Sequence, residues 1–291
     1  MDNFDDLFDT QNGEGQLFDV ETWKERKQQD REYAYSLLDE GTQNLASNYE
    51  YFRDYLDIQS RFDRYSVSNA ILISHQMPEA TRLADFNTWK SSGVYIKRSE
   101  EAIIILEPGK EYVREDGTKG LGMNVKRVFD ISQTELHWKT YPEAKPEQRS
   151  KLKFLIASSP CKILSSDALS ENICARYSPE DNKIYIRPGM SGDDIFRSLA
   201  QEIAIAEFAG RGVDRKDCAF TAYCASYMLC EKNGFSVEGF SFERAPEQFE
   251  GMELKDIREK LGDIRNTANT ISQEMHRQQE KAACVKDTGA R

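Results

Sequence analysis

Apolar positions at helical spacing dominate residues 21–61 of the chain. Four of them recur at intervals of four, three and four and therefore share one helical face: Leu45, Tyr49, Phe52 and Leu56. Gly41 predicts a break that divides the segment into two helices. Residues 65–76 predict a third helix, which ends before Pro78 because proline cannot continue the helical hydrogen bonds.

Strand patterns follow this helical part. Residues 80–90 predict a short helix that ends before Gly93, and the apolar run 102–106 predicts a strand. A Glu-Asp-Gly turn signal at residues 115–117 precedes the alternating run 124–129. We expect these strands to form a small antiparallel sheet beside the preceding helices.

The second half of the chain predicts a hairpin and two long helices. Residues 175–187 alternate around a Pro-Glu-Asp-Asn turn. The central helix covers residues 196–208, with Ser191 or Asp193 available as its N-cap. A further helix from about residue 214 to residue 232 is stopped by the Asn-Gly pair that follows.

A heptad pattern marks the C-terminal segment. Its apolar positions alternate in steps of three and four: Leu254, Ile257, Leu261, Ile264, Ala268, Ile271 and Met275. Dimerisation through a coiled coil is one interpretation, and a long helix packed on the body of the protein is the other. We favour packing, because Gly262 and Ala268 weaken a free-standing coil, and we expect fraying after His276.

Together these patterns predict an α+β protein. N-terminal helices with a small antiparallel sheet precede a second domain of helices and sheet, and a C-terminal helix closes the chain. The predicted segments are an acidic tail (1–20), a first domain (21–137), a linker (138–150), a second domain (151–250) and an amphipathic helix with a frayed tail (251–291).

Charge is distributed unevenly along the chain. The 291 residues carry a net charge of −11, which argues against a general polyanion binder. Residues 1–20 hold six acidic residues and no lysine or arginine. This segment is either a solvated tail or a docking motif for a protein partner, in which Phe4, Leu7 and Phe8 form an apolar face.

Targeting and redox signals point to a cytoplasmic protein. No apolar run reaches the 18 residues or more of a membrane span, and no charged start precedes an apolar stretch as in a signal peptide. None of the six cysteines forms a Cys-x-x-Cys pair. We expect reduced thiols, mostly buried as small apolar side chains.

The central helix contains the most informative short motif, Gln201-Glu202-Ile203-Ala204-Ile205. Zinc peptidases carry His-Glu-x-x-His in such a helix, because two histidines at i and i+4 hold Zn²⁺ and the glutamate acts as general base. Here Gln201 and Ile205 stand at the two ligand positions, and neither is a suitable zinc ligand. Only Glu202 is kept, and we expect it to accept hydrogen bonds from Gln201 or Tyr223, or to be held by an arginine.

Residues 65–134 resemble the N-terminal domain of ArdC-like antirestriction proteins, which are carried on conjugative plasmids and integrative elements. The matching positions run from the third helix to the last strand of the sheet: Tyr65, Ser66, Asn69, Leu72, Ile73, Gln76, Pro78, Ala80, Thr81, Phe86, Trp89, Gly93, Tyr95, Lys97, Glu100, Pro108 and residues 128–134. The resemblance implies binding of single-stranded DNA. One departure is the run from Arg98 to Ala102, where the family has Lys-Gly-Glu-Lys-Gly.

Residues 185–230 resemble the zincin-like C-terminal domain of the same family. There a glutamate on the next helix completes the zinc site, and Tyr223 stands at that position here. The resemblance therefore implies a domain that has lost all three zinc ligands, at Gln201, Ile205 and Tyr223. The three histidines, His75, His137 and His276, lie elsewhere in the chain.

Candidate DNA-binding residues combine this resemblance with chemistry. Bases stack on aromatic rings and phosphates meet lysine or arginine. The candidates are Arg64, Tyr65, Asn69, Gln76, Trp89, Tyr95, Lys97, Arg98 and Lys126. We expect Phe86, by contrast, to fill the core.

The sequence thus supports a non-enzymatic, single-stranded-DNA-binding accessory protein of a mobile element, similar to antirestriction proteins. No metal or other cofactor is expected. An acidic interaction protein or DNA mimic that inhibits a host defence enzyme is the first alternative, and a residual metallopeptidase is the second. The pattern leaves the oligomeric state open.

Overall fold

The structure is a computed structural model that describes residues 20–113, 118–135 and 148–288. Apart from Val20, the acidic segment 1–20 lies outside these residues, as do the turn predicted at 115–117 and most of the predicted linker. Within the described ranges, no helix is long and apolar enough to cross a membrane.

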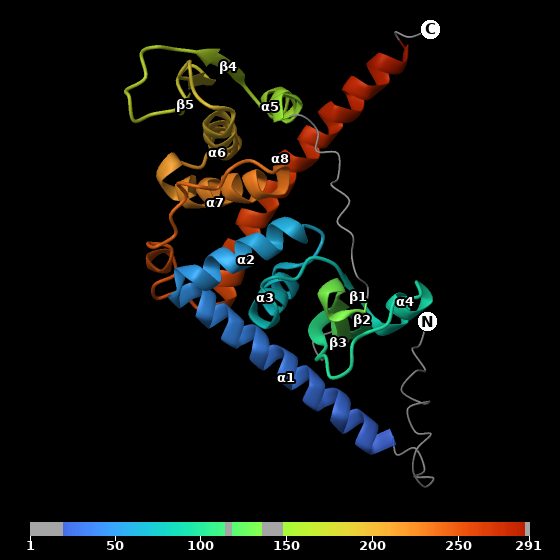
Figure 1. Ribbon diagram of the computed structural model, residues 1–291. Helices are drawn as coiled ribbons and strands as arrows, with labels where there is room; N and C mark the ends of the chain where they lie inside the picture. The colour runs from blue at the N-terminus through green and yellow to red at the C-terminus, as the bar shows by residue number, and fades with distance from the viewer. Residues whose placement is uncertain (1–19, 114–117, 136–147, 289–291) are drawn as a thin grey trace.

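Three helices open the fold (Figure 1): α1 (Val20–Ser47), α2 (Tyr49–Arg61) and α3 (Val67–Gln76). The break expected at Gly41 is wrong, because α1 continues through this residue. The break falls at Asn48, whose side chain accepts a hydrogen bond of 2.8 Å from the Glu50 N–H and caps α2. Gly41 instead permits close packing, since a Cβ there would lie 2.9 Å from Cγ2 of Ile71 on α3.

A three-stranded antiparallel sheet of order β1-β3-β2 packs against α1 and α3. Its strands are β1 (Leu83–Ala84), β2 (Ile103–Val113) and β3 (Lys119–Asp130). The short helix α4 (Phe86–Ser91) follows β1, and a 3₁₀ turn, η2 (Ile131–Gln133), follows β3. The helix expected over 80–90 is therefore shorter, because residues 83–84 pair with β3 and Asp85 caps α4.

The second half has a sheet of order β4-β6-β5, with β4 parallel and β5 antiparallel to β6, covered by helices. The elements are α5 (Gln148–Ala157), β4 (Lys162–Ser165), β5 (Ala175–Ser178), β6 (Lys183–Ile186), α6 (Gly192–Gly210), α7 (Arg215–Asn233) and the 3₁₀ turn η3 (Pro246–Gln248). The predicted hairpin is confirmed as β5 and β6. Ser191, not Asp193, caps α6, and Gly234 ends α7 with a left-handed φ of 71°.

The long helix α8 (Leu254–Thr288) contacts both halves of the chain (Figure 1). Its heptad positions from Ile257 to Met275 are buried inside this single chain, which is the packing that the sequence favours. Arg258 pairs with Asp39 of α1 at 2.9 Å. The helix also continues past His276 to Thr288. The mixture of helices with two small sheets is the expected α+β class.

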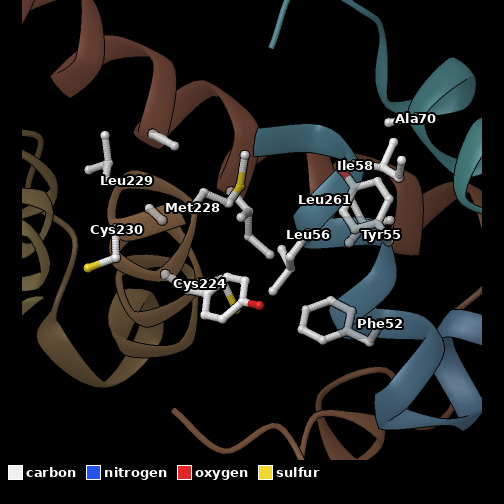
Figure 2. Packing of buried hydrophobic residues seen from close by; sticks show 14 of the residues in the cluster. Phe52, Tyr55, Leu56, Ile58, Ala70, Cys224, Met228, Leu229, Cys230 and Leu261 are labelled. Carbon is white, nitrogen blue, oxygen red and sulfur yellow. The ribbon is translucent and has the colours of Figure 1, made fainter. Parts of the chain in front are cut away.

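The two halves meet where α2 packs on α7 (Figure 2). Phe52 of α2 contacts the rings of Phe220, Phe242 and Phe249. Polar contacts border this aromatic cluster: the Tyr227 hydroxyl donates to Asp57 at 2.6 Å, and Lys232 pairs with Asp63 at 2.6 Å. Because large buried rings contribute strongly to packing, this junction fixes the first half against α7.

Two glycines in helices should respond in opposite ways to alanine. Gly41→Ala should lower the free energy of unfolding by about 1–2 kcal/mol, because its Cβ displaces the branched side chain of Ile71. Gly262→Ala in α8 should raise it by about 0.5–1 kcal/mol, since nothing lies within 4 Å of the added Cβ. Urea unfolding measures both, and equal effects would contradict the packing of α1 on α3.

Asp57 should make stability depend on pH. Burial raises the pKa of Asp57, and the hydrogen bond from Tyr227 lowers it by less. Because the pKa is raised, the ionised carboxylate of Asp57 destabilises the folded state. This destabilisation is present at pH values above the pKa of Asp57 and disappears at lower pH, where the carboxyl group is protonated. Asp57→Asn should therefore raise Tm near neutral pH, because the amide has no charge to bury. The gain over wild type should vanish at low pH, and a gain that is independent of pH would contradict this account.

Candidate functional site

Glu202 lies inside the second half, with 7% of its side chain exposed. The backbone N–H of Tyr177 donates to Oε2 at 2.7 Å. The guanidinium of Arg215, at the start of α7, donates from Nη1 to Oε1 at 3.0 Å and from Nη2 to Oε2. Of the partners expected for Glu202, an arginine is thus the one that the structure provides.

The residues around Glu202 have their own partners. Gln201 is partly buried, and Ile205 is 2% exposed within the core. The Tyr223 hydroxyl accepts a hydrogen bond of 2.8 Å from the Ser241 N–H, and its ring packs against Phe240 and Phe242. Burial raises the pKa of Tyr223, which keeps it a neutral phenol. Tyr223 therefore contacts the loop after α7, whereas the contacts of Glu202 come from Arg215 and β5.

Asn69 and Gln76 hold strand β2 against α3. The Asn69 side chain donates to the Leu106 C=O and accepts from its N–H, both at 2.8 Å. Gln76 makes the same pair of bonds to Ile104, both at 2.9 Å. Both amides replace a neighbouring strand along this edge, so their observed role is to position β2.

The burial of Trp89 and Phe86 is the reverse of what the sequence predicts. Trp89 is 4% exposed, and its indole N–H donates to the Phe129 C=O at 2.9 Å. A ring in this position cannot be a base-stacking platform, which corrects the role predicted for it. Phe86, expected in the core, is 51% exposed with Lys90 over its ring.

The remaining candidates of the first half differ in how accessible they are. Tyr65 is half-buried against Phe62, and Arg64 is exposed. Lys126 bridges Asp85 at 3.2 Å and Glu107 at 3.5 Å. Burial lowers the pKa of Lys126, but its bond to Asp85 and the charge of Glu107 outweigh this and raise it. Two carboxylates thus already neutralise this lysine.

Residues 82–98 run from the short edge strand β1 through α4 and form a compact excursion beside the sheet. At one end the Arg82 N–H donates to Asp130 at 2.7 Å, and at the other the Lys97 N–H donates to the Gln133 C=O at 2.9 Å. Figure 1 shows α4 projecting beside the sheet. The excursion carries four basic residues and one acidic residue, Asp85.

We call five of its accessible aromatic and basic residues, those that follow β1, the α4 surface: Phe86, Lys90, Tyr95, Lys97 and Arg98. Tyr95 is 61% exposed. The Lys97 ammonium donates to the Ser132 C=O at 2.7 Å, which fixes its position but leaves it exposed. Ser99 follows with a φ of 66°, a left-handed backbone at the position where the resemblance has glycine.

Solved structures show which fold this is. The crystal structure of metal-free antirestriction protein ArdC from plasmid R388 superposes with a TM-score of 0.51 and 19% identity, over 73% of this chain and 86% of that one. Its Mn(II)-bound form gives a TM-score of 0.51 and 17% identity, over 72% and 85%. The chain has the ArdC fold.

Sequence comparisons reach less far than the ArdC structures. No family model matches the chain. The uncharacterized protein pXO2-81 of Bacillus anthracis is 31% identical over 97 residues. The match covers 32% of this chain and 16% of that protein.

The residues of α6 and α7 do not fit the metal that the ArdC resemblance implies. Ile205 has no donor atom, and the Tyr223 hydroxyl is already hydrogen-bonded. Glu202 is occupied by Arg215 and Tyr177. Among the residues that the structure describes, no group of three or more His, Cys, Asp or Glu is placed to hold a metal ion.

Sequence reasoning missed two parts of this site. The sequence did not identify Arg215 as the partner of Glu202. Arg215 is the first residue of α7, the helix that follows α6, and this position allows it to reach a buried carboxylate on α6. Phe86 was assigned to the core, and its spacing of three from Trp89 would place both rings on one helical face. The structure buries only Trp89, which the spacing could not show.

The positioning role of Asn69 is testable. Asn69→Ala leaves the buried Leu106 N–H and C=O without partners, so the free energy of unfolding should fall by about 1–3 kcal/mol. The exposed Asn172→Ala is a matched control and should stay within about 0.5 kcal/mol of wild type. Urea unfolding compares the two, and an unchanged Asn69→Ala would show that the amide does not hold β2.

Proposed function

We propose that this protein is an antirestriction-like accessory protein of a plasmid or related mobile element, and that it binds single-stranded DNA through the α4 surface. The ArdC fold over 73% of the chain supports the first part. That neighbour is an antirestriction protein, and we propose the same role for this chain. The protein acts without metallopeptidase chemistry, as a zincin-like pseudoenzyme.

The α4 surface is the observation that carries the DNA-binding proposal. Exposed rings of Phe86 and Tyr95 accompany Lys90, Lys97 and Arg98 on one short excursion. Single strands bind where aromatic rings stack with bases and cations meet phosphates. This local basic excursion stands out in a protein whose net charge is −11, so its charge is complementary to a nucleic acid while the protein as a whole is not.

The partners of Glu202 support the proposed absence of hydrolysis. A general base must reach a metal-bound water. Glu202 accepts bonds from Arg215 and Tyr177, and the neighbouring positions Ile205 and Tyr223 supply no metal ligand. Residual peptidase activity has no support in this arrangement.

The acidic interaction protein is the second candidate. The six acidic residues among residues 1–20 favour it. In that case deletion of residues 1–20 abolishes capture of a host protein, while single strands do not bind in a salt-dependent way. The DNA experiment below therefore separates the two functions.

Tyr95→Ala and Phe86→Ala should each weaken binding of a fluorescein-labelled oligothymidylate by about five- to a hundred-fold, because each removes a stacking platform. Tyr33→Ala on α1 is the matched control, since Tyr33 is 56% exposed against 61% for Tyr95. Fluorescence polarisation measures the affinities. Equal affinities for all three variants and wild type would reject the α4 surface.

Lys97 and Arg98 should act through charge. The double variant Lys97→Ala/Arg98→Ala should reduce the slope of log affinity against log salt concentration by about 1.4, because two phosphate contacts are lost and each contributes about 0.7 for single strands. Polarisation titrations between about 50 and 200 mM salt give the slope. An unchanged slope in a folded variant would place the phosphate contacts elsewhere.

A further inference from the structure

We infer that the guanidinium of Arg215 supplies, beside Glu202, the positive charge that the zincin resemblance assigns to a metal ion, and that an ion pair rather than a divalent cation holds α6, α7 and β5 together. The inference concerns the second half alone and does not depend on DNA binding by the α4 surface.

Three donors occupy both oxygens of the carboxylate. Arg215 contacts both oxygens of Glu202, and the Tyr177 N–H adds a third donor at 2.7 Å. Paired donation of this kind is the strongest geometry that an arginine forms with a carboxylate. A metal ion at Glu202 would have to displace Arg215.

The same carboxylate caps the edge of the second sheet. β5 is an edge strand, and the Tyr177 N–H donates to Glu202. Unpaired N–H groups on an edge strand invite pairing with another chain. Glu202 thus connects three elements, with Arg215 at the start of α7, its own position on α6 and Tyr177 on β5.

Electrostatics make the pair necessary. A carboxylate in a site that is 7% exposed is costly unless a cation and hydrogen bonds compensate its charge. Arg215 has 28% of its side chain exposed and retains contact with water. The cation is therefore partly solvated, while the anion depends on it.

Thermal unfolding of the full chain tests the ion pair. Arg215→Met should lower Tm by about 5–10 °C, because it leaves Glu202 buried without a counter-charge. Adding Glu202→Gln should recover part of this loss, since the amide can still accept from Tyr177 and carries no charge. Arg244→Ala, which breaks the exposed pair with Glu247, is the control and should leave Tm within about 1 °C.

A second variant keeps the test decisive if Arg215→Met does not fold. Arg215→Lys retains the charge but loses the paired geometry, and it should fold with a smaller loss of Tm. An Arg215→Met protein as stable as wild type would overturn the inference. So would a double variant that is less stable than Arg215→Met alone.

Addition of metal ions tests directly whether the guanidinium of Arg215 takes the place of a metal ion beside Glu202. Excess Mn(II) or Zn(II) should leave the Tm of wild type within about 1 °C of its value in EDTA, because a ligand that binds the folded state would raise it. A rise of several degrees that Glu202→Gln abolishes would show that a cation binds at Glu202, and would overturn the inference.

Discussion

The buried carboxylate of Glu202 imposes the main electrostatic constraint on the second half of the molecule. A charge at 7% exposure requires a counter-charge, and Arg215 provides it from the first residue of α7. Because the Tyr177 N–H uses the same carboxylate, the position of Glu202 fixes how α6, α7 and β5 meet. The ArdC fold of this chain thus places an arginine, rather than a metal ligand, against this glutamate.

A second constraint acts in the first half, through hydrogen bonds of side-chain amides. Asn69 and Gln76 satisfy the edge of β2, and Asp130 holds the start of the excursion that carries α4. These contacts leave the rings and cations of the α4 surface exposed on a fixed frame. Asn69 and Gln76 therefore serve the frame, whereas Tyr95 and Lys97, which match the same family pattern, stay exposed.

Local signals in the sequence predicted much of the fold. Ser191 caps α6, and the heptad of α8 is buried against the body. The predictions that are wrong depend on contacts between residues that are distant in the sequence. Gly41 was expected to break a helix, but it permits the approach of Ile71.

In the candidate site, too, local signals were predictable from the sequence and contacts between distant residues were not. The sequence alone predicts the loss of metal ligands at Gln201 and Ile205. It also marks Tyr95, Lys97 and Arg98, which are accessible in the structure. Sequence spacing could not show that Trp89 faces Phe129 or that Asp85 and Glu107 neutralise Lys126. These contacts depend on how β3 runs beside α4 and β2, which is visible only in the structure.

The central claim is that this ArdC fold engages single-stranded DNA without a metal ion. The most direct measurement is the affinity for a labelled single strand by polarisation, once in EDTA and once with excess Mn(II), at constant ionic strength. The account predicts equal affinities in the two conditions. Binding that appears only with Mn(II), or that EDTA abolishes, would contradict it.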